Sequence, residues 1–317
     1  MLNHVYLGYD GGGTKTDCVL LGDDGAVLAE SRGGPANPMR VGFDAAFAAL
    51  RDCSERVLAA ASAEASQVAG VCAGLAGCGR KVVADRVATF LREQFPRAVV
   101  HATSDSMVAL EAATDSGPGV VIIAGTGSVV LGRNAAGEVV RAGGYGPWIG
   151  DEGSGYDVGR RAVIAVARAR DELGPATRLS ELLLRAMEVN DWPELVGRIA
   201  AGADQVYPRL YPVVVGAAEE GDAVAREILV AAATALAELA VSVIRRLNFA
   251  SEEFILAKSG GVFGRTQLFD GPLDERLAQG APRARIEALR MPPAMGAARL
   301  ARRLAARAGD TAHGATH

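Results

Sequence analysis

The residues with the clearest potential for chemistry lie near the N-terminus. Asp10 is followed directly by Gly11–Gly13 and then by the hydroxyl-bearing Thr14 and Thr16. Glycine lacks a Cβ atom and tolerates positive φ, so it lets a ligand approach backbone N–H groups closely. Phosphate oxygens suit such a nest, whereas a nearby carboxylate suits a hydrated Mg²⁺ ion rather than the phosphate itself. A tight hairpin that binds nothing is the alternative interpretation of the glycines alone.

Predicted strands position this loop. Val5–Gly8 is an apolar run that predicts a buried strand, and Asp17–Leu21 predicts a second strand that returns at once, so the glycines form a hairpin turn. A weaker copy of the pattern follows, with strand Val120–Ala124, the small-residue turn Gly125–Ser128 and strand Val129–Gly132. Two such hairpins in successive halves indicate an internal duplication. If they face each other across a cleft, they can hold a nucleotide's phosphates from both sides.

The remaining elements alternate between strands and helices. Further strands are predicted at 26–31, 68–75, 99–102, 139–142, 254–257 and 283–289, and helices at 43–65, 85–95, 106–113, 157–173 and 294–308. The alanine-rich stretch 174–249 predicts helices with breaks near Gly174, Trp192, Pro208–Pro212 and Gly221. The order of elements predicts a mixed α/β protein with ligand loops at strand ends, and residues 309–317 predict a disordered tail.

The composition excludes several classes of protein. A formal net charge of -4 gives no sign of a nucleic-acid-binding surface. The most apolar long stretch, Ile228–Ile244, contains Glu238 and predicts a buried core helix rather than a membrane span. No signal-peptide pattern is visible, and the four cysteines form no Cys-x-x-Cys pair. We therefore expect a cytoplasmic protein with no nucleic-acid or membrane partner, no disulfide framework and no zinc site.

Five motifs occur in order along the chain. They are Asp10-Gly-Gly-Gly-Thr-Lys15, Ile123-Ala-Gly-Thr-Gly-Ser128, Gly150-Asp-Glu-Gly153, Ser259-Gly-Gly261 and Pro293-Ala-Met-Gly-Ala-Ala298. Apart from the third, they resemble the two phosphate motifs, the adenosine motif and the second connecting helix of the actin/hexokinase/Hsp70 superfamily. Within it, the chain resembles the BadF/BadG/BcrA/BcrD ATPase family and its N-acetylglucosamine kinase branch, over about residues 4 to 305.

The resemblance implies an α/β fold of two ribonuclease H-like (actin-like ATPase) domains that flank a nucleotide and sugar cleft. The implied domains are residues 1–115 and 116–317, with the final helix 294–308 packing back on the first domain. ATP and Mg²⁺ are the implied cofactors, with Asp10 near the metal. The implied ATP-binding residues are Gly12, Gly13, Thr14, Gly125, Thr126, Gly127, Gly260 and Gly261. A plain turn after a core strand is the alternative for the last two.

The resembling kinases place their catalytic aspartate at the position of Asp105. A carboxylate there can accept the proton of a sugar hydroxyl as it attacks the γ-phosphate. An N-cap of the following helix is the alternative for this residue. The implied sugar-binding residues are Asn37, Asp105, Gly144, Tyr145, Asp151 and Glu152. A plain Asn turn is the alternative for Asn37, and a cap of the helix at Asp157 is the alternative for Glu152.

The function implied by the resemblance is phosphorylation of N-acetylglucosamine at the 6-hydroxyl. Tyr145 stands where animal N-acetylglucosamine kinases carry Trp, and Val129 stands where they carry Asn, so glucosamine, N-acetylmuramic acid and glucose stay as alternative substrates. Trp148 either supplies the missing aromatic wall or belongs to the core. Bacterial glucosamine kinases carry Ser-Asp-Gln at Gly150–Glu152, which favours the acetylated sugar.

Two other functional classes remain to be weighed. Relatives that activate a reductase or dehydratase bridge an iron–sulfur cluster with cysteines of the second half, and this chain has none after Cys78. Sugar kinases with a cysteine-rich zinc loop are excluded for the same reason. Asp105 argues against a sugar-binding regulator without catalysis. The partners implied by the family are a small-molecule sugar and a second copy of the chain in a homodimer.

Overall fold

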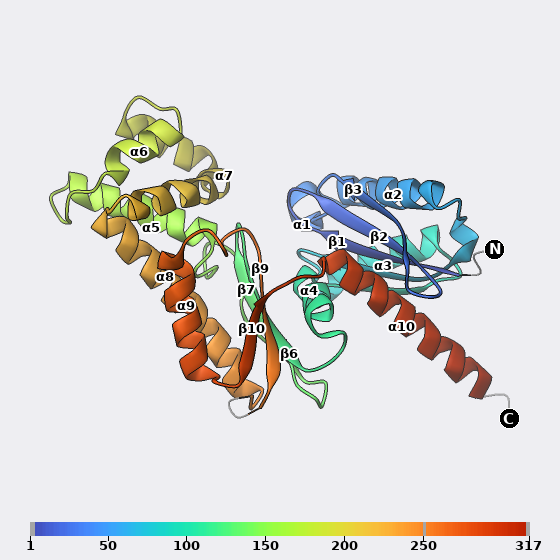
Figure 1. Ribbon diagram of the computed structural model, residues 1–317. Coiled ribbons are helices and arrows are strands. Elements are labelled where there is room, and N and C mark those ends of the chain that lie inside the picture. The colour runs from blue at the N-terminus through green and yellow to red at the C-terminus, as the bar shows by residue number, and fades with distance from the viewer. Residues whose placement is uncertain (1–3, 250–251, 315–317) are drawn as a thin grey trace. The chain divides into compact units, whose positions relative to one another are not determined.

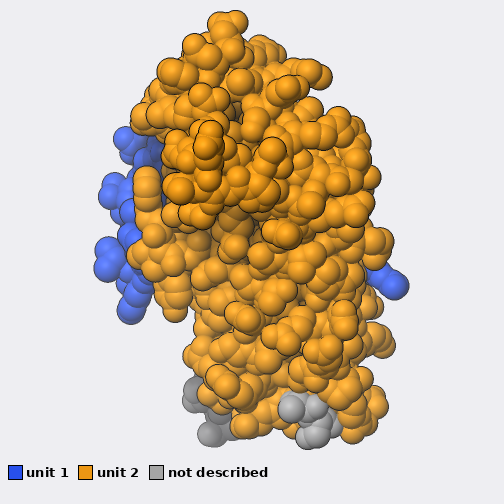
Figure 2. All heavy atoms as spheres, turned by 90° about the vertical axis from the view of Figure 1, so that its left-hand side faces the viewer, with its two compact units in different colours: residues 1–117, 289–317 blue, residues 118–288 orange. Residues whose placement is uncertain are grey.

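The computed structural model describes residues 4–249 and 252–314 (Figure 1). The chain divides into two compact units, shown in different colours in Figure 2. Unit 1 consists of residues 1–117 and 289–317, and unit 2 consists of residues 118–288. The C-terminal segment therefore belongs to the same unit as the N-terminal segment.

Unit 1 is built on a five-stranded mixed sheet in the order β3-β2-β1-β4-β5. Its strands are β1 (Val5–Gly11), β2 (Thr16–Gly22), β3 (Val27–Gly33), β4 (Val68–Leu75) and β5 (Val99–Thr103). β1, β2 and β3 form an antiparallel meander, while β4 is parallel to β1 and β5 is parallel to β4. The β1–β2 turn therefore lies at the edge of the sheet where β4 and β5 also end.

Helices cover both faces of this sheet. They are α1 (Pro38–Val41), α2 (Phe43–Ala60), α3 (Lys81–Gln94), α4 (Asp105–Thr114) and α10 (Pro293–Gly314), with a 3₁₀ turn at Ala65–Gln67. Side chains of β1 alternate between the faces, so Leu7 and Tyr9 are fully buried in a core shared with α2 and α3. Gly8 faces α10, and a Cβ on it would lie 2.1 Å from Ala298 N. α10 therefore packs directly against the backbone of the sheet.

Unit 2 repeats the same sheet topology, in the order β10-β9-β6-β7-β8. Its strands are β6 (Gly119–Ala124), β7 (Ser128–Arg133), β8 (Val139–Gly143), β9 (Phe254–Ser259) and β10 (Ala284–Ala288). The first three again form an antiparallel meander, while β9 is parallel to β6 and β10 is parallel to β9. The duplication predicted from the two hairpins thus extends to the whole sheet.

Among the described residues, helices complete unit 2. They are α5 (Gly155–Arg170), α6 (Leu179–Ala186), α7 (Trp192–Glu219), α8 (Ala223–Arg246) and α9 (Gln267–Gly280). By length and composition α8 is apolar enough to cross a membrane, with a mean hydropathy of 2.0 over its most apolar window. Its side chains Leu229, Leu236 and Val243 are nevertheless fully buried in the core of unit 2. The prediction that Ile228–Ile244 forms a buried core helix is therefore confirmed.

A single carboxylate ties the start of α8 to the start of α6. Asp222 caps α8, since its Oδ1 accepts a hydrogen bond from Ala225 N at 2.8 Å. Its Oδ2 accepts from Arg178 N at 2.8 Å and from Thr177 Oγ1 at 2.9 Å. Because the side chain is almost fully buried, these bonds supply the partners that the charge has lost from water.

The break expected near Pro208–Pro212 is wrong. α7 continues through both prolines and departs from helical geometry only at Gly202. Each proline removes a backbone hydrogen bond, at a cost of about 3 kcal/mol in a helix interior. Leu210 and Val214 on this stretch are fully buried, and burying such side chains contributes about 1.5–3 kcal/mol each. Packing therefore offsets the cost of the prolines.

Two further elements differ from the prediction. α9 was not predicted, because Gly271 and Pro272 interrupt its apolar pattern. α10 extends to Gly314, so the disordered tail expected from Gly309 is wrong as far as residue 314, and residues 315–317 lie outside the described part of the chain. The four-residue α1 is too short to leave a periodic signal.

Candidate active site

In unit 1 the turn between β1 and β2 is bonded to the loop that carries Asn37. Residues 11–15 are named the first glycine loop, and Gly12 N closes it by donating to Lys15 O at 2.9 Å. The carbonyl of Gly12 accepts from Ala36 N and from Asn37 N, each at 3.1 Å. These bonds bring a predicted sugar-binding residue beside the predicted phosphate-binding loop.

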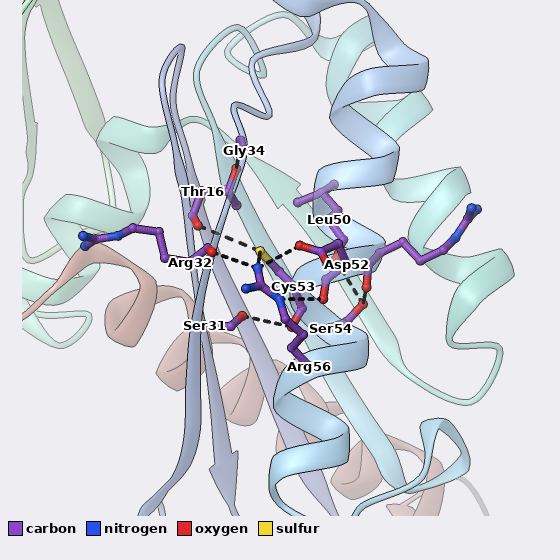
Figure 3. A network of polar contacts seen from close by, with 10 residues as sticks. Thr16, Ser31, Arg32, Gly34, Leu50, Asp52, Cys53, Ser54 and Arg56 are labelled. Carbon is purple, nitrogen blue, oxygen red and sulfur yellow. Dashed lines mark hydrogen bonds and ion pairs between the residues drawn. The ribbon is translucent and has the colours of Figure 1, made fainter.

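A polar network behind the first glycine loop joins β2, β3 and α2 (Figure 3). Thr16 Oγ1 donates to Gly34 O at 2.7 Å, and Cys53 Sγ lies 3.9 Å from Thr16 O. Arg56 Nη2 donates to Arg32 O at 2.8 Å from the same helix. Thr16 is fully buried, so its hydroxyl positions the loop from behind.

Asn37 is the N-cap of α1. Its Oδ1 accepts from Met39 N at 3.0 Å, so the amide has the turn-forming role that was its alternative interpretation. Its Nδ2 group has no acceptor among the residues that the structure describes. The amide can therefore hold the turn with its oxygen and still donate to a ligand with its nitrogen.

Asp105 is the first residue of α4 but does not cap it. The cap is Ser104, whose Oγ accepts from Met107 N at 3.2 Å. Asp105 Oδ1 accepts from Ser106 N at 2.8 Å. The alternative that Asp105 serves as the N-cap is therefore wrong. Its carboxylate lies just after β5 and is not needed to cap α4, because Ser104 does so.

Asp10 lies at the end of β1, close enough to Asp105 for their charges to interact. Burial, followed by the charges of Asp105 and Asp17, raises the pKa of Asp10 to about 7. A divalent cation relieves such repulsion between carboxylates. Within residues 4–249 and 252–314 no group of three His, Cys, Asp or Glu forms a metal cluster. Mg²⁺ typically takes one or two carboxylates plus phosphate oxygens and water, so Asp10 fits this ion.

In unit 2 the turn between β6 and β7 is bonded to the start of α5. Residues 125–127 are named the second glycine loop. The carbonyl of Gly125 accepts from Gly155 N at 2.8 Å, and that of Thr126 accepts from Tyr156 N at 3.2 Å. The N–H groups at the start of α5 thus bond two carbonyls of the loop. These bonds place Asp151 and Glu152, which precede α5, next to the loop.

Asp151 is the most constrained of these acids. Its side chain is 7% exposed and its φ of 64° lies in the left-handed region, where Asp is one of the better tolerated residues. A Cβ on Gly127 would lie 2.8 Å from Asp151 Oδ2, and Ser128 N donates to Asp151 Oδ1 at 3.3 Å. Burial raises the pKa of Asp151, and the bond from Ser128 offsets this only in part. The second glycine loop therefore encloses this carboxylate.

Glu152 does not cap α5, so that alternative is wrong. The cap is Ser154, whose Oγ accepts from Asp157 N at 3.1 Å, while Asp157 Oδ2 accepts from Gly153 N at 2.9 Å. The sequence contains this signal, since a Ser followed three residues later by an acid marks a reciprocal helix cap. Glu152 Oε2 is buried and has no partner among the described residues. A buried acceptor of this kind calls for a donor.

The two glycines of the predicted adenosine motif differ. Gly260 has a φ of 121°, and a Cβ on it would lie 2.1 Å from Ala124 O, which also accepts from Val262 N at 3.2 Å. Gly260 therefore forms the tight turn after β9, as its alternative interpretation expects. Gly261 is exposed, and a Cβ there would meet nothing within 4 Å. The backbone at Gly261 is open to a flat ligand.

The loop after β8 presents aromatic side chains to solvent. Gly144 has a φ of 68°, and the ring of Tyr145 is 5.4 Å from the guanidinium carbon of Arg141, which donates to Gly143 O at 3.0 Å. Trp148 is 83% exposed, so its assignment to the core is wrong. The loop therefore exposes two aromatic side chains, Tyr145 and Trp148, on the segment that leads to the two acids.

A family model for the BadF/BadG/BcrA/BcrD ATPase family matches residues 7–301 of the chain. The chain belongs to this family. The matched range includes the two glycine loops and the segments bonded to them. The similarity therefore covers every segment of both candidate sites.

Named relatives agree with this assignment. The N-acetyl-D-glucosamine kinase of Dictyostelium discoideum is 33% identical over 95% of this chain and 98% of its own. The N-acetylmuramic acid/N-acetylglucosamine kinase of Clostridium acetobutylicum is 28% identical over 93% of this chain and 97% of its own. A solved structure from Chromobacterium violaceum, provisionally named an N-acetylglucosamine kinase, has a TM-score of 0.74 and 25% identity, covering 95% of this chain and all of that one. The predicted fold class, a two-domain actin-like ATPase, is confirmed.

Proposed function

We propose that this protein is an ATP-dependent amino-sugar kinase that phosphorylates N-acetylglucosamine at its 6-hydroxyl group. The observation that carries the proposal is Asp105, a carboxylate at the end of β5 whose helix is capped by Ser104 instead. Family membership supports ATP as the phosphoryl donor. The relative that is 33% identical supports the choice of sugar.

Unit 1 supplies the base and part of the sugar contacts. Asp105 accepts the proton of the 6-hydroxyl as its oxygen attacks the γ-phosphorus, the bond from that phosphorus to the β-phosphate oxygen breaks, and ADP leaves. Asn37 Nδ2 donates to a sugar hydroxyl. Asp10 would hold Mg²⁺, which supplies positive charge to the phosphate oxygens when bound.

Unit 2, taken by itself, carries groups that suit phosphate, a purine and a sugar. N–H groups of the second glycine loop suit phosphate oxygens, and the open backbone at Gly261 suits a purine. Asp151 and Glu152 suit a pair of vicinal sugar hydroxyls. The unpartnered Glu152 Oε2 supports this role, because a sugar hydroxyl supplies the hydrogen bond that the described residues do not.

The test is sugar-dependent release of ADP by the purified protein with ATP and Mg²⁺. The panel is N-acetylglucosamine, glucosamine, N-acetylmuramic acid, glucose and no sugar. We expect the strongest stimulation by N-acetylglucosamine and a product phosphorylated at the 6-position. Stronger stimulation by another sugar would identify that sugar as the substrate instead of N-acetylglucosamine. Equal release of ADP with every sugar and without sugar would overturn the kinase assignment.

A further inference from the structure

Arg40, in the short helix α1, lies against the first glycine loop. A Cβ atom on Gly13 would lie 2.8 Å from Arg40 Nη1, 3.1 Å from its Cδ and 3.6 Å from its Cζ. Gly13 does not have positive φ, so its backbone conformation does not require glycine. The missing side chain at Gly13 instead makes room for the Arg40 side chain.

The other cations near this loop, Lys15 and Arg32, share one carboxylate, that of Asp17. Lys15 Nζ lies 2.6 Å from Asp17 Oδ2, and Arg32 Nε lies 2.6 Å from Asp17 Oδ1. Arg40 is exposed, and in the part of the chain that the structure describes it has no carboxylate within ion-pair distance. An uncompensated guanidinium therefore rests on a loop whose backbone is suited to phosphate.

The position of α1 indicates which phosphate this is. α1 begins directly after Asn37, whose backbone N–H is bonded to Gly12 O. Arg40 thus stands where the first glycine loop meets the loop proposed to hold the sugar. Phosphoryl transfer brings the γ-phosphate to that junction, because this group alone bonds to the sugar oxygen.

We propose that Arg40 is a catalytic residue that donates hydrogen bonds from its guanidinium to the γ-phosphate oxygens of ATP. A guanidinium presents planar paired donors that match phosphate oxygens, and its charge stabilises the charge that spreads over the γ-phosphoryl group during transfer. The nucleotide contact rests on membership of the ATPase family, and the role in transfer rests on the proposed function.

The first test is binding of Mg²⁺–AMPPNP and Mg²⁺–ADP without sugar, measured by isothermal titration calorimetry on the full chain. Arg40→Ala is expected to weaken AMPPNP about 10- to 100-fold and ADP less than about fivefold. Arg40→Lys keeps a point charge without the paired donors and is expected to fall in between. Arg92→Ala is the matched control, because Arg92 is an exposed arginine in the last turn of α3, which runs away from this edge of the sheet.

A double-mutant cycle tests the role of Gly13. If Gly13 makes room for Arg40, Gly13→Ala weakens AMPPNP by a smaller factor in the Arg40→Ala background than in the wild type. Equal factors in the two backgrounds would overturn this reading. Equal loss of AMPPNP and ADP in Arg40→Ala, or loss of neither, would overturn the γ-phosphate contact.

Kinetics separate this inference from the proposed function. In the kinase assay Arg40→Ala should lower kcat and raise the KM for ATP, with the KM for sugar unchanged. A rise confined to the KM for N-acetylmuramic acid, which carries a carboxylate, would assign Arg40 to the sugar and overturn the inference. If the wild type binds AMPPNP in an Arg40-dependent way but phosphorylates no sugar, the proposed function fails and the nucleotide contact stands. If the wild type does not bind AMPPNP, both fail.

Discussion

Replacement of Asp105 by Asn separates catalysis from stability. Asn has the same shape and keeps an Oδ1 that can accept the 2.8 Å bond from Ser106 N. The helix cap is untouched, because Ser104 provides it. Asn cannot accept a proton at neutral pH, so the variant loses the proposed general base while it keeps the local structure.

The magnitude follows from the size of each contribution. General-base catalysis is worth about 10²–10⁴-fold, so kcat should fall by that factor. A substitution that keeps its hydrogen bond should change the unfolding free energy by less than about 0.5 kcal/mol. Ser104→Ala reverses the pattern, because loss of the cap costs about 1 kcal/mol while the carboxylate stays in place.

The assay couples ADP release to sugar phosphorylation, with urea unfolding of the same preparations. We expect Asp105→Asn to lose kcat and keep its unfolding free energy, and Ser104→Ala to lose unfolding free energy and keep most of its kcat. Retention of more than about a tenth of the wild-type kcat by Asp105→Asn would refute the assignment of the base.

Three further results are expected. Gly260→Ala places a methyl group 2.1 Å from a backbone oxygen of β6 at positive φ and should lower the unfolding free energy by at least about 2 kcal/mol in urea, whereas Gly261→Ala, in open space, should change it by less than about 0.5 kcal/mol. Asp151→Asn keeps a residue type that tolerates left-handed backbone, so it should raise the KM for the sugar about tenfold or more without loss of stability, and an unchanged KM would count against sugar binding. Burial raises the pKa of Asp222, but the hydrogen bonds to its carboxylate lower it further, to below the usual Asp value. Its charge therefore stabilises unit 2 above about pH 4, and that contribution is lost as the pH falls. The difference in unfolding free energy between wild type and Asp222→Asn, about 1–3 kcal/mol at pH 7, should narrow toward pH 3, and a constant difference would contradict this account.

The sequence predicts elements well where an apolar run ends in glycines. Val68–Leu75 is predicted with the bounds that β4 has, because a buried strand reads as a continuous apolar run and the following glycines end it. The same logic finds both hairpins. It fails for α7 and α9, where burial of neighbouring side chains holds prolines inside helices, and burial cannot be read from local pattern.

The candidate site shows a similar division. Motif spacing places Asp10, Asp105 and the glycines near the ends of strands, which are visible in the sequence. Spacing does not show which residue caps a helix, and both Ser104 and Ser154 replace an acid in that role. It gives no sign of Arg40 either, because the contact with Gly13 depends on a one-turn helix with no periodic pattern.

The repeated sheet topology has a consequence for the ancestry of the molecule. Both sheets order their strands third, second, first, fourth, fifth, as two copies of one ancestral domain would. Asp10 stands at the end of the first strand in one copy, whereas the corresponding strand end in the other, Ile123-Ala124, carries no acid. Divergence after duplication thus left the acid at this position in one copy only, while in the other copy the backbone of Ala124 lies against Gly260.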